Sequence, residues 1–146
     1  MERTLAFYAN LFSRDFTAYT TRRLGEIGLS FASLFPLIYV GKHPGCTQSQ
    51  LTGALGLDWG YSQRTVTRLT EEGFLIRTRQ GRAWCLDLTP KGQEAFGLSH
   101  QVFWDWDAGA LAGLTEAERN QLFTLLAKIQ IERQAHRHVR NFVQPL

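Results

Sequence analysis

Residues 47–88 read TQSQLTGALGLDWGYSQRTVTRLTEEGFL and then IRTRQGRAWCLDL, and this stretch decides the fold. Thr47 and Gln50 have the spacing of a capping box, so a short helix is expected to begin there and to end at Gly56. Asp58 is a suitable N-cap for a second helix, which Gly73 closes. A short helix, a tight turn and a second helix are typical of a helix-turn-helix.

The second helix has two faces of different character. Ser62, Val66 and Leu69 share one face and are assigned to packing. The other face is polar and carries arginines, as a helix that reads DNA does. The arginines of such a face reach guanine edges or phosphates, and the sequence leaves both open. The candidate DNA-contacting residues of this helix are Tyr61, Gln63, Arg64, Thr65, Thr67 and Arg68, with Gln63 and Thr65 flanking the others.

A β-hairpin is predicted after this helix. Residues 75–79 and 82–88 flank Gln80-Gly81, and Trp84, Leu86 and Leu88 alternate with Ala83, Cys85 and Asp87. Its tip carries Arg77, Arg79 and Arg82, which are further candidates for DNA contact. A hairpin beside a reading helix makes a winged helix-turn-helix.

At these residues the chain resembles the MarR family of bacterial transcription regulators. The matching pieces are TQSQL, LGLDWGYSQRTVTRL, EEGFL with its strand, and DLTPKGQEAF, and the resemblance covers nearly the whole chain. It implies a mainly α fold with a small β-wing and a single domain over residues 1–146. The winged head is expected at about 30–89, and dimerisation helices at about 2–25 and 115–146. One departure concerns the wing: the family's Asp-x-Arg pair, after a longer loop, is replaced by Gln80-Gly81-Arg82, so the tip arginine lacks its bracing Asp.

The resemblance also implies a function. It is that of a dimeric repressor, bound to a pseudo-palindromic operator in double-stranded DNA and released by a small effector. The family's effector cleft lies between the dimerisation stem and the head. The residues on helices that are expected to line it are Arg22, Arg23, Phe31, Phe35, Tyr39, His43 and Trp104. An aromatic wall with a basic group suits an aromatic acid or similar amphiphile, although an ordinary core explains the same aromatic residues.

The flanking segments have helical apolar patterns. The first helix, at about 2–25, is apolar on two sides, and a second helix at 31–42 begins after Ser30 and is expected to bend at Pro36. Thr89 and Pro90 start a helix that runs to about Leu111. Thr115 and Glu118 form a second capping-box spacing. The helix they open carries two apolar stripes, Leu122, Leu125, Leu126 and Ile129, and Ile131, Ala135, Val139 and Phe142.

These terminal helices carry more apolar surface than the winged head can cover. Two-fold symmetric homo-oligomers are the commonest way to bury such a surface. A homodimer would present two reading helices to half-sites about one DNA turn apart.

Composition narrows the functional classes. The chain has 146 residues, 44% of them hydrophobic, and a net charge of +3, which fits one globular domain. Positive charge gathers where the winged helix is predicted, with five arginines (64, 68, 77, 79 and 82) against Glu71 and Glu72. No membrane span, secretory signal or disulfide framework is evident, so a cytoplasmic protein is expected. No catalytic or cofactor-binding motif is recognised, and an enzyme is not expected.

Other interpretations of single residues remain open. Trp59, Trp104 and Trp106 are assigned to packing, as most tryptophans are. Cys46 and Cys85 suggest a redox sensor, and His43 with Cys46, His136 and His138 suggests a metal-sensing regulator, but no four-ligand pattern is present and no metal is expected. A winged helix that binds protein instead of DNA is the alternative from another class, and exposed apolar residues on the reading face would favour it.

Overall fold

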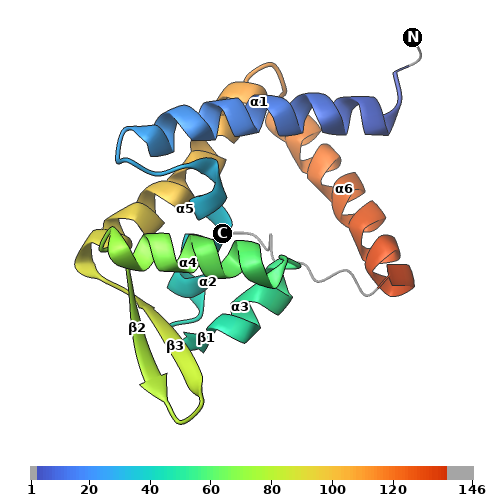
Figure 1. Cartoon of the computed structure of the whole chain (residues 1–146). Helices are drawn as coiled ribbons and strands as arrows, with labels where there is room; N and C mark the ends of the chain where they lie inside the picture. Colours follow the sequence, from blue (N-terminus) through green and yellow to red (C-terminus); the bar gives the residue numbers. More distant parts are fainter. Residues whose placement is uncertain (1–2, 138–146) are drawn as a thin grey trace.

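The computed structural model describes residues 3–137, with side chains described for residues 3–130. The elements follow one another as α1 (Leu5–Gly25), a 3₁₀ turn (Phe31–Ser33), α2 (Leu34–Lys42), β1 (Cys46–Thr47), α3 (Gln48–Leu55), α4 (Trp59–Glu71), β2 (Leu75–Gln80), β3 (Ala83–Leu88), α5 (Pro90–Ala110) and α6 (Glu116–Arg137). Figure 1 shows a head of α2, α3, α4 and the strands below a stem of α1, α5 and α6. The predicted mainly α fold with a small β-wing is confirmed.

The helix-turn-helix forms as its caps predict. The Thr47 hydroxyl accepts from the Gln50 N–H at 3.0 Å, and the Gln50 side chain accepts from the Thr47 N–H at 2.9 Å. Gly56 ends α3 in the left-handed conformation, with φ 64°. The buried hydroxyls of Thr52 on α3 and Ser62 on α4 lie 2.7 Å apart and tie the two helices together. Beneath them is a fully buried core that includes Leu34, Leu37, Leu51, Val66 and Leu69.

The sheet contains a strand that the sequence did not reveal. Its order is β1-β3-β2, and β1 pairs with β3 through Cys46 opposite Leu86. The hairpin loop lies one residue later than predicted: Gln80 pairs with Ala83, so Gly81 and Arg82 form the turn. Gly81 has φ 62°, which glycine adopts without strain.

The predicted alternation along β3 is wrong near the tip. Trp84 is 42% exposed, whereas its neighbour Cys85 is buried. The hairpin extends beyond the helices that cover the base of the sheet (Figure 1), so Trp84 has no core to enter. Cys85 and Leu86 lie further from the tip, at the level of β1, and are covered.

The single bent helix predicted at 31–42 is wrong. A 3₁₀ turn (Phe31–Ser33) precedes α2, and Pro36 lies in the first turn of α2. The N–H groups of a first helical turn have no intrahelical partner, so proline removes no bond there. The Ser30 side chain makes no capping bond and instead accepts from Arg68 at 3.2 Å.

α5 is joined firmly to the head where it begins. We call this contact between Thr89–Gly92 and Glu72–Phe74 the Thr89 joint. The Thr89 hydroxyl accepts from the Gly92 N–H at 2.9 Å and caps the helix, while the Thr89 N–H donates to the Phe74 carbonyl at 3.1 Å. The Lys91 ammonium donates to the Glu72 carbonyl at 2.8 Å. A Cβ at Gly92 would lie 2.0 Å from the Phe74 carbonyl oxygen, so only glycine fits this contact.

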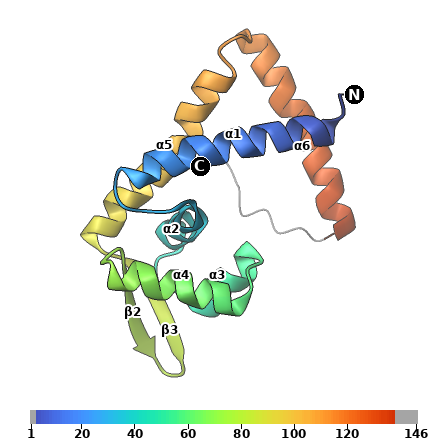
Figure 2. The same ribbon diagram turned by 45° about the horizontal axis from the view of Figure 1, so that its top comes forward.

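In the stem, α1 lies across α5 (Figure 2). Arg23 on α1 forms an ion pair with Asp105 on α5 at 3.0 Å, and the Trp106 indole donates to Asp15 at 2.9 Å. Helix α1 begins at Leu5, after the N-cap Thr4 and not at Glu2. Thr115 and Glu118 form the predicted capping box of α6.

The stem leaves much apolar surface uncovered. Figure 1 shows α6 running away from α5 and apart from the head. The exposed large apolar residues of α1 and α6 are Leu5, Leu11, Phe12, Phe123, Leu125, Leu126 and Ile129. Of the predicted second stripe of α6, Ile131 and Ala135 lie where no side chains are described, and Val139 and Phe142 lie outside the described residues.

Candidate nucleic-acid interface

The outer face of α4 gathers the polar residues that the sequence indicated. The helix starts at the Asp58 cap, whose carboxylate accepts from the Tyr61 N–H at 3.1 Å. Tyr61, Gln63, Arg64 and Arg68 are exposed and Thr67 is half-buried, while Ser62, Val66 and Leu69 are buried as predicted. We call these five exposed or half-exposed residues the α4 face. They lie above an apolar face, as in a helix that docks into a groove.

Two expectations for α4 need correction. Thr65 is only 4% exposed, because it shares the buried side of the helix with Ser62 and Leu69, and it is not available for DNA contact. Trp59, assigned to packing, is 50% exposed at the start of the helix. It adds an exposed aromatic ring at the N-terminal end of α4 that sequence reasoning missed.

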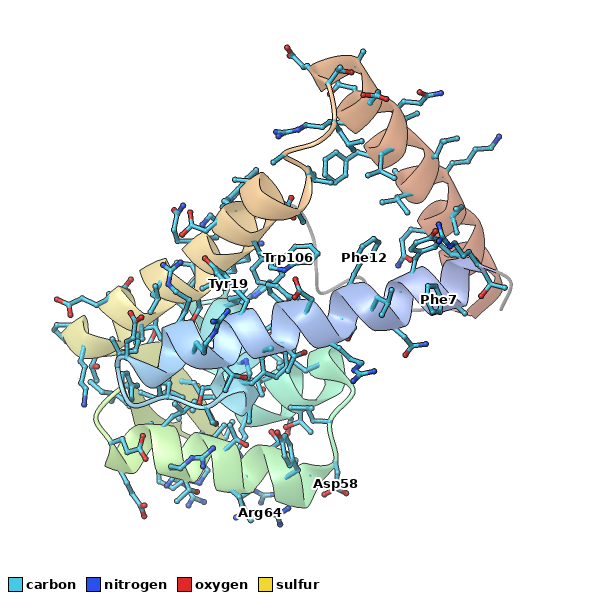
Figure 3. The ribbon with its side chains drawn as sticks, turned by 90° about the horizontal axis from the view of Figure 1, so that it is seen from above. Phe7, Phe12, Tyr19, Asp58, Arg64 and Trp106 are labelled. Atoms are coloured by element: carbon cyan, nitrogen blue, oxygen red, sulfur yellow. The ribbon has the colours of Figure 1, made fainter. Side chains whose placement is uncertain are left out.

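Arg64 folds back along the start of α4. A Cβ built at Gly60 would lie 3.3 Å from an Arg64 guanidinium nitrogen and 3.2 Å from an Asp58 carboxylate oxygen. Figure 3 shows Arg64 and Asp58 along the same edge of the helix. A side chain at residue 60 would therefore be in tight contact with the guanidinium, which would have to shift by a few tenths of an ångström.

The wing holds two of its arginines against a tryptophan. The guanidinium carbons of Arg77 and Arg79 each lie 5.5 Å from the centre of the Trp84 ring. Arg79 also donates to the Gly81 carbonyl at 3.2 Å and so supports the turn. Arg82 is exposed within the turn itself. Among the described residues, no carboxylate forms an ion pair with these three arginines.

Of the seven residues expected to line an effector cleft, the structure brings Phe31 against Phe35 and Tyr39 against His43. Phe31 and Phe35 pack edge-on at 6.3 Å within an aromatic cluster that includes Phe16 and Phe103. Tyr39 stacks on His43 at 4.3 Å. Of the other three, Arg22 is exposed, Arg23 is paired with Asp105, and Trp104 is 52% exposed, so no cleft lined by all seven is seen among the described residues.

A hollow of about 240 Å³ lies instead between α1 and α5. It is lined by Phe12, Ser13, Phe16, Phe103, Trp106 and Asp107. Figure 3 shows Trp106 directed towards the α1 segment that carries Phe12, and their rings meet edge-on at 6.2 Å. Burial raises the pKa of the Asp107 carboxyl, and the charge of Arg119 partly offsets this. The helical spacing of Phe12 with Phe16 and of Phe103 with Trp106 was the sequence signal for this site.

The cysteines and histidines do not assemble a sensor centre in the part of the chain described. Cys46 and Cys85 are buried and unbridged. Burial, with a smaller effect of the Asp87 charge, raises the pKa of the Cys46 thiol to about 11, so the thiol stays protonated at neutral pH. Over residues 3–130, no three His, Cys, Asp or Glu side chains are grouped as a metal site; His136 and His138 lie beyond the described side chains.

The chain is similar to known transcription regulators over nearly its whole length. No family model matches it. It is 41% identical over 139 residues to the HTH-type transcriptional regulator BilQ of Clostridium symbiosum, covering 93% of this chain and 96% of that one. A crystal structure of MarR matches with a TM-score of 0.83 and 26% identity, over 94% of this chain and 97% of the other. A MarR family regulator from Listeria monocytogenes complexed with a 26mer DNA matches with a TM-score of 0.76 and 25% identity, over 93% and 91%.

These relatives are regulators and not enzymes. Within residues 3–137, no helix has the length and apolar character needed to cross a membrane. The helix-turn-helix, the wing and the α1, α5 and α6 stem are all present in one chain, and they match solved regulators from end to end. The protein is therefore a DNA-binding transcriptional regulator and belongs to the MarR family.

Proposed function

We propose that the protein is a cytoplasmic, dimeric repressor that binds a pseudo-palindromic operator and leaves it when a small effector binds. The observation that carries the DNA-binding part is the α4 face, in which Arg64 is exposed above a fully buried Val66 and Leu69. The wing adds three arginines without carboxylate partners in the described chain. The structure of the similar regulator from Listeria monocytogenes in complex with DNA supports DNA binding by this fold.

Two kinds of contact are assigned. On α4, base edges are read by Arg64 with Tyr61, Gln63, Thr67 and Arg68, because arginine and amide side chains match base donors and acceptors. On the wing, Arg77, Arg79 and Arg82 contact phosphates, which supply affinity without sequence information. Thr65 is left out because it is buried.

Selection of bound fragments from the host genome tests this assignment and identifies the operator. On the selected operator, Arg64→Ala should cost about 1–3 kcal/mol, more than on random DNA, if Arg64 makes a bidentate base contact. Arg14→Ala is the matched control, since Arg14 is an exposed arginine on α1. Equal operator affinity for the Arg64 and Arg14 variants would contradict the assignment.

Dimerisation is proposed from the uncovered stem. Phe123, Leu125, Leu126 and Ile129 on α6 are all at least 40% exposed. Burying apolar surface contributes about 25 cal/mol per Å², so a second copy seated on this surface is strongly favoured. The two α4 helices would then face half-sites about 34 Å apart.

Light scattering checks the dimer with a pair of charge substitutions. Leu125→Asp should give a monomer, because it places a charge within the proposed interface. Thr124→Asp adds the same charge at an exposed neighbouring position on α6 and should leave the dimer intact. A dimeric Leu125→Asp protein would contradict this use of α6.

The effector is proposed to bind in the hollow between α1 and α5. Phe12 lines the hollow and is also 54% exposed on the stem surface, so a second copy would help to close it. The charged lining residue is the Asp107 carboxyl, and none of the lining residues is basic. We therefore replace the expected aromatic acid by a small aromatic compound that carries an amine or another hydrogen-bond donor.

A thermal-shift screen distinguishes the two effector classes. Small aromatic amines should raise the melting temperature and lower operator affinity, whereas the corresponding acids should do neither. Asp107→Asn should weaken the response to amines, with Glu94→Gln as a control, since Glu94 is an exposed carboxylate on the same helix outside the hollow. A response to acids that survives Asp107→Asn would refute the proposed chemistry.

A protein-binding role of the head is the second candidate. Trp59 and Tyr61 are 50% and 40% exposed at the start of α4, and exposed aromatic residues are common in protein interfaces. The genomic selection separates the candidates, because a head that binds only protein would enrich no DNA sequence.

A further inference from the structure

Trp84 lies on the wing where a packing role does not explain it. It is 42% exposed and stands near the tip of the hairpin, directly opposite Arg79 in the strand register. Arg77 is two residues from Arg79 on β2, so both arginines extend from the same side of the hairpin as Trp84. Both guanidinium carbons are 5.5 Å from the ring centre.

Both guanidinium groups lie against the same indole ring, and no carboxylate in the described chain pairs with either of them. Arg79 has one further contact, to the Gly81 carbonyl at 3.2 Å. The face of an indole ring carries negative charge density, and it attracts a nearby cation. Trp84 is thus the contact that Arg77 and Arg79 share, and it limits the conformations of both long side chains.

Such restraint has a consequence for binding. A long side chain that is mobile before binding loses about 0.5–1.5 kcal/mol of conformational freedom when it is fixed against a phosphate. Arginines already held beside the ring lose less. The ring does not neutralise their charge, so both remain able to contact the DNA backbone.

We infer that Trp84 is a positioning residue that orders Arg77 and Arg79 on the wing for contact with DNA phosphates. This inference rests on the proposed DNA binding and adds a residue that the proposed set does not contain. Trp84 acts here through the arginines, and it compensates for a wing whose turn, Gly81-Arg82, is short.

The test uses a labelled random-sequence duplex, because phosphate contacts do not depend on the operator. Trp84→Phe keeps an aromatic face, whereas Trp84→Leu and Trp84→Met keep an apolar side chain without one. Binding is measured by fluorescence anisotropy across a salt series, with melting temperatures recorded for each variant. The same substitutions are made in an Arg77→Ala/Arg79→Ala background.

The expected result is a loss of affinity of about fivefold for Trp84→Leu and Trp84→Met, the size of one exposed cation–π contact, with Trp84→Phe close to wild type. In the background without the two arginines, Trp84→Leu should have no further effect. The number of phosphates contacted should stay the same, so the slope of log affinity against log salt should not change.

Two results would overturn the inference. One is wild-type affinity in both variants without a ring. The other is an equal loss with and without the arginines, which would mean that the ring contacts DNA itself. Wild-type protein that binds no duplex at low salt would remove the proposed function as well, so the two failures are distinguishable.

Discussion

Gly60 is a residue at which a substitution is expected to affect stability and DNA binding differently. Glycine within a helix usually costs about 0.5–1 kcal/mol relative to alanine. At this position, however, a Cβ would crowd the Arg64 guanidinium at 3.3 Å and the Asp58 carboxylate at 3.2 Å. Gly60→Ala should therefore keep its stability within about 1 kcal/mol of wild type and weaken operator binding modestly, since the Arg64 guanidinium must shift by a few tenths of an ångström.

The double variant Gly60→Ala/Arg64→Ala is the control, measured by denaturant unfolding and operator titration. It should bind no more weakly than Arg64→Ala alone. A Gly60→Ala protein with wild-type operator affinity would mean that the position of Arg64 does not matter for recognition.

The Cys46 thiol is expected to be unreactive in the folded protein. Its thiol pKa of about 11 leaves about one thousandth of the groups as thiolate at pH 8. Iodoacetamide should label the folded protein slowly and the urea-unfolded protein rapidly. Because the pKa of this thiol is raised from 9.0 in the folded protein, ionisation of Cys46 does not lower the free energy of unfolding below pH 9. That free energy falls as pH rises from 9 to about 11. Cys46→Ala should lack that loss, and rapid labelling of native Cys46 would reopen the redox-sensing alternative.

The residues of the candidate site could be predicted where one helix alone determines them. The exposed positions of Arg64 and Arg68 and the buried positions of Val66 and Leu69 follow from helical spacing. The same helical spacing also predicts that Thr65 is buried. The position of the Arg23 side chain could not be predicted, because its partner Asp105 is distant in the chain and meets it only when α1 crosses α5.

Helices and strands were predictable to the extent that their ends carry local signals. The caps Thr47, Asp58, Thr89 and Thr115 each start a helix as expected. β1 was missed because it has two residues and is defined by pairing with the distant β3. The hairpin loop was misplaced by one residue because glycine takes the first position of the turn and not the second.

Two glycines of α5 should respond in opposite directions to alanine. Gly92→Ala should destabilise the protein by about 1–3 kcal/mol or more, because its Cβ would lie 2.0 Å from the Phe74 carbonyl oxygen, which is backbone and cannot rotate away. Gly97→Ala, in the same helix with open space around it, should stabilise by about 1 kcal/mol. Thermal unfolding of the Gly92→Ala and Gly97→Ala variants tests how tightly the Thr89 joint is packed. Equal melting temperatures for the two variants would show that the joint has room for a side chain.

For the molecule as a whole, folding and pairing are expected to be coupled. α6 leaves its large apolar residues exposed in the single chain, so the proposed second copy would bury this surface. The melting temperature should therefore rise with protein concentration, because association stabilises the folded state by mass action. Calorimetry over a hundredfold concentration range checks this, with Leu125→Asp as the variant whose melting temperature should not vary. A wild-type melting temperature independent of concentration would mean that the single chain is stable alone.

The Thr89 joint also gives the molecule the mechanics of a lever. α5 has 21 residues, so it is about 31 Å long, and its first turn is fixed to the end of α4 and the base of the wing. A tilt of about 5° at the stem end displaces the other end by about 2.7 Å, if the helix moves as a rigid rod. Hydrogen bonds to base edges fail beyond about 3.5 Å, so a displacement of this size is enough to break them. Small changes in how α1 and α5 pack are thereby expected to displace α4 far enough to make or break its proposed contacts with base edges.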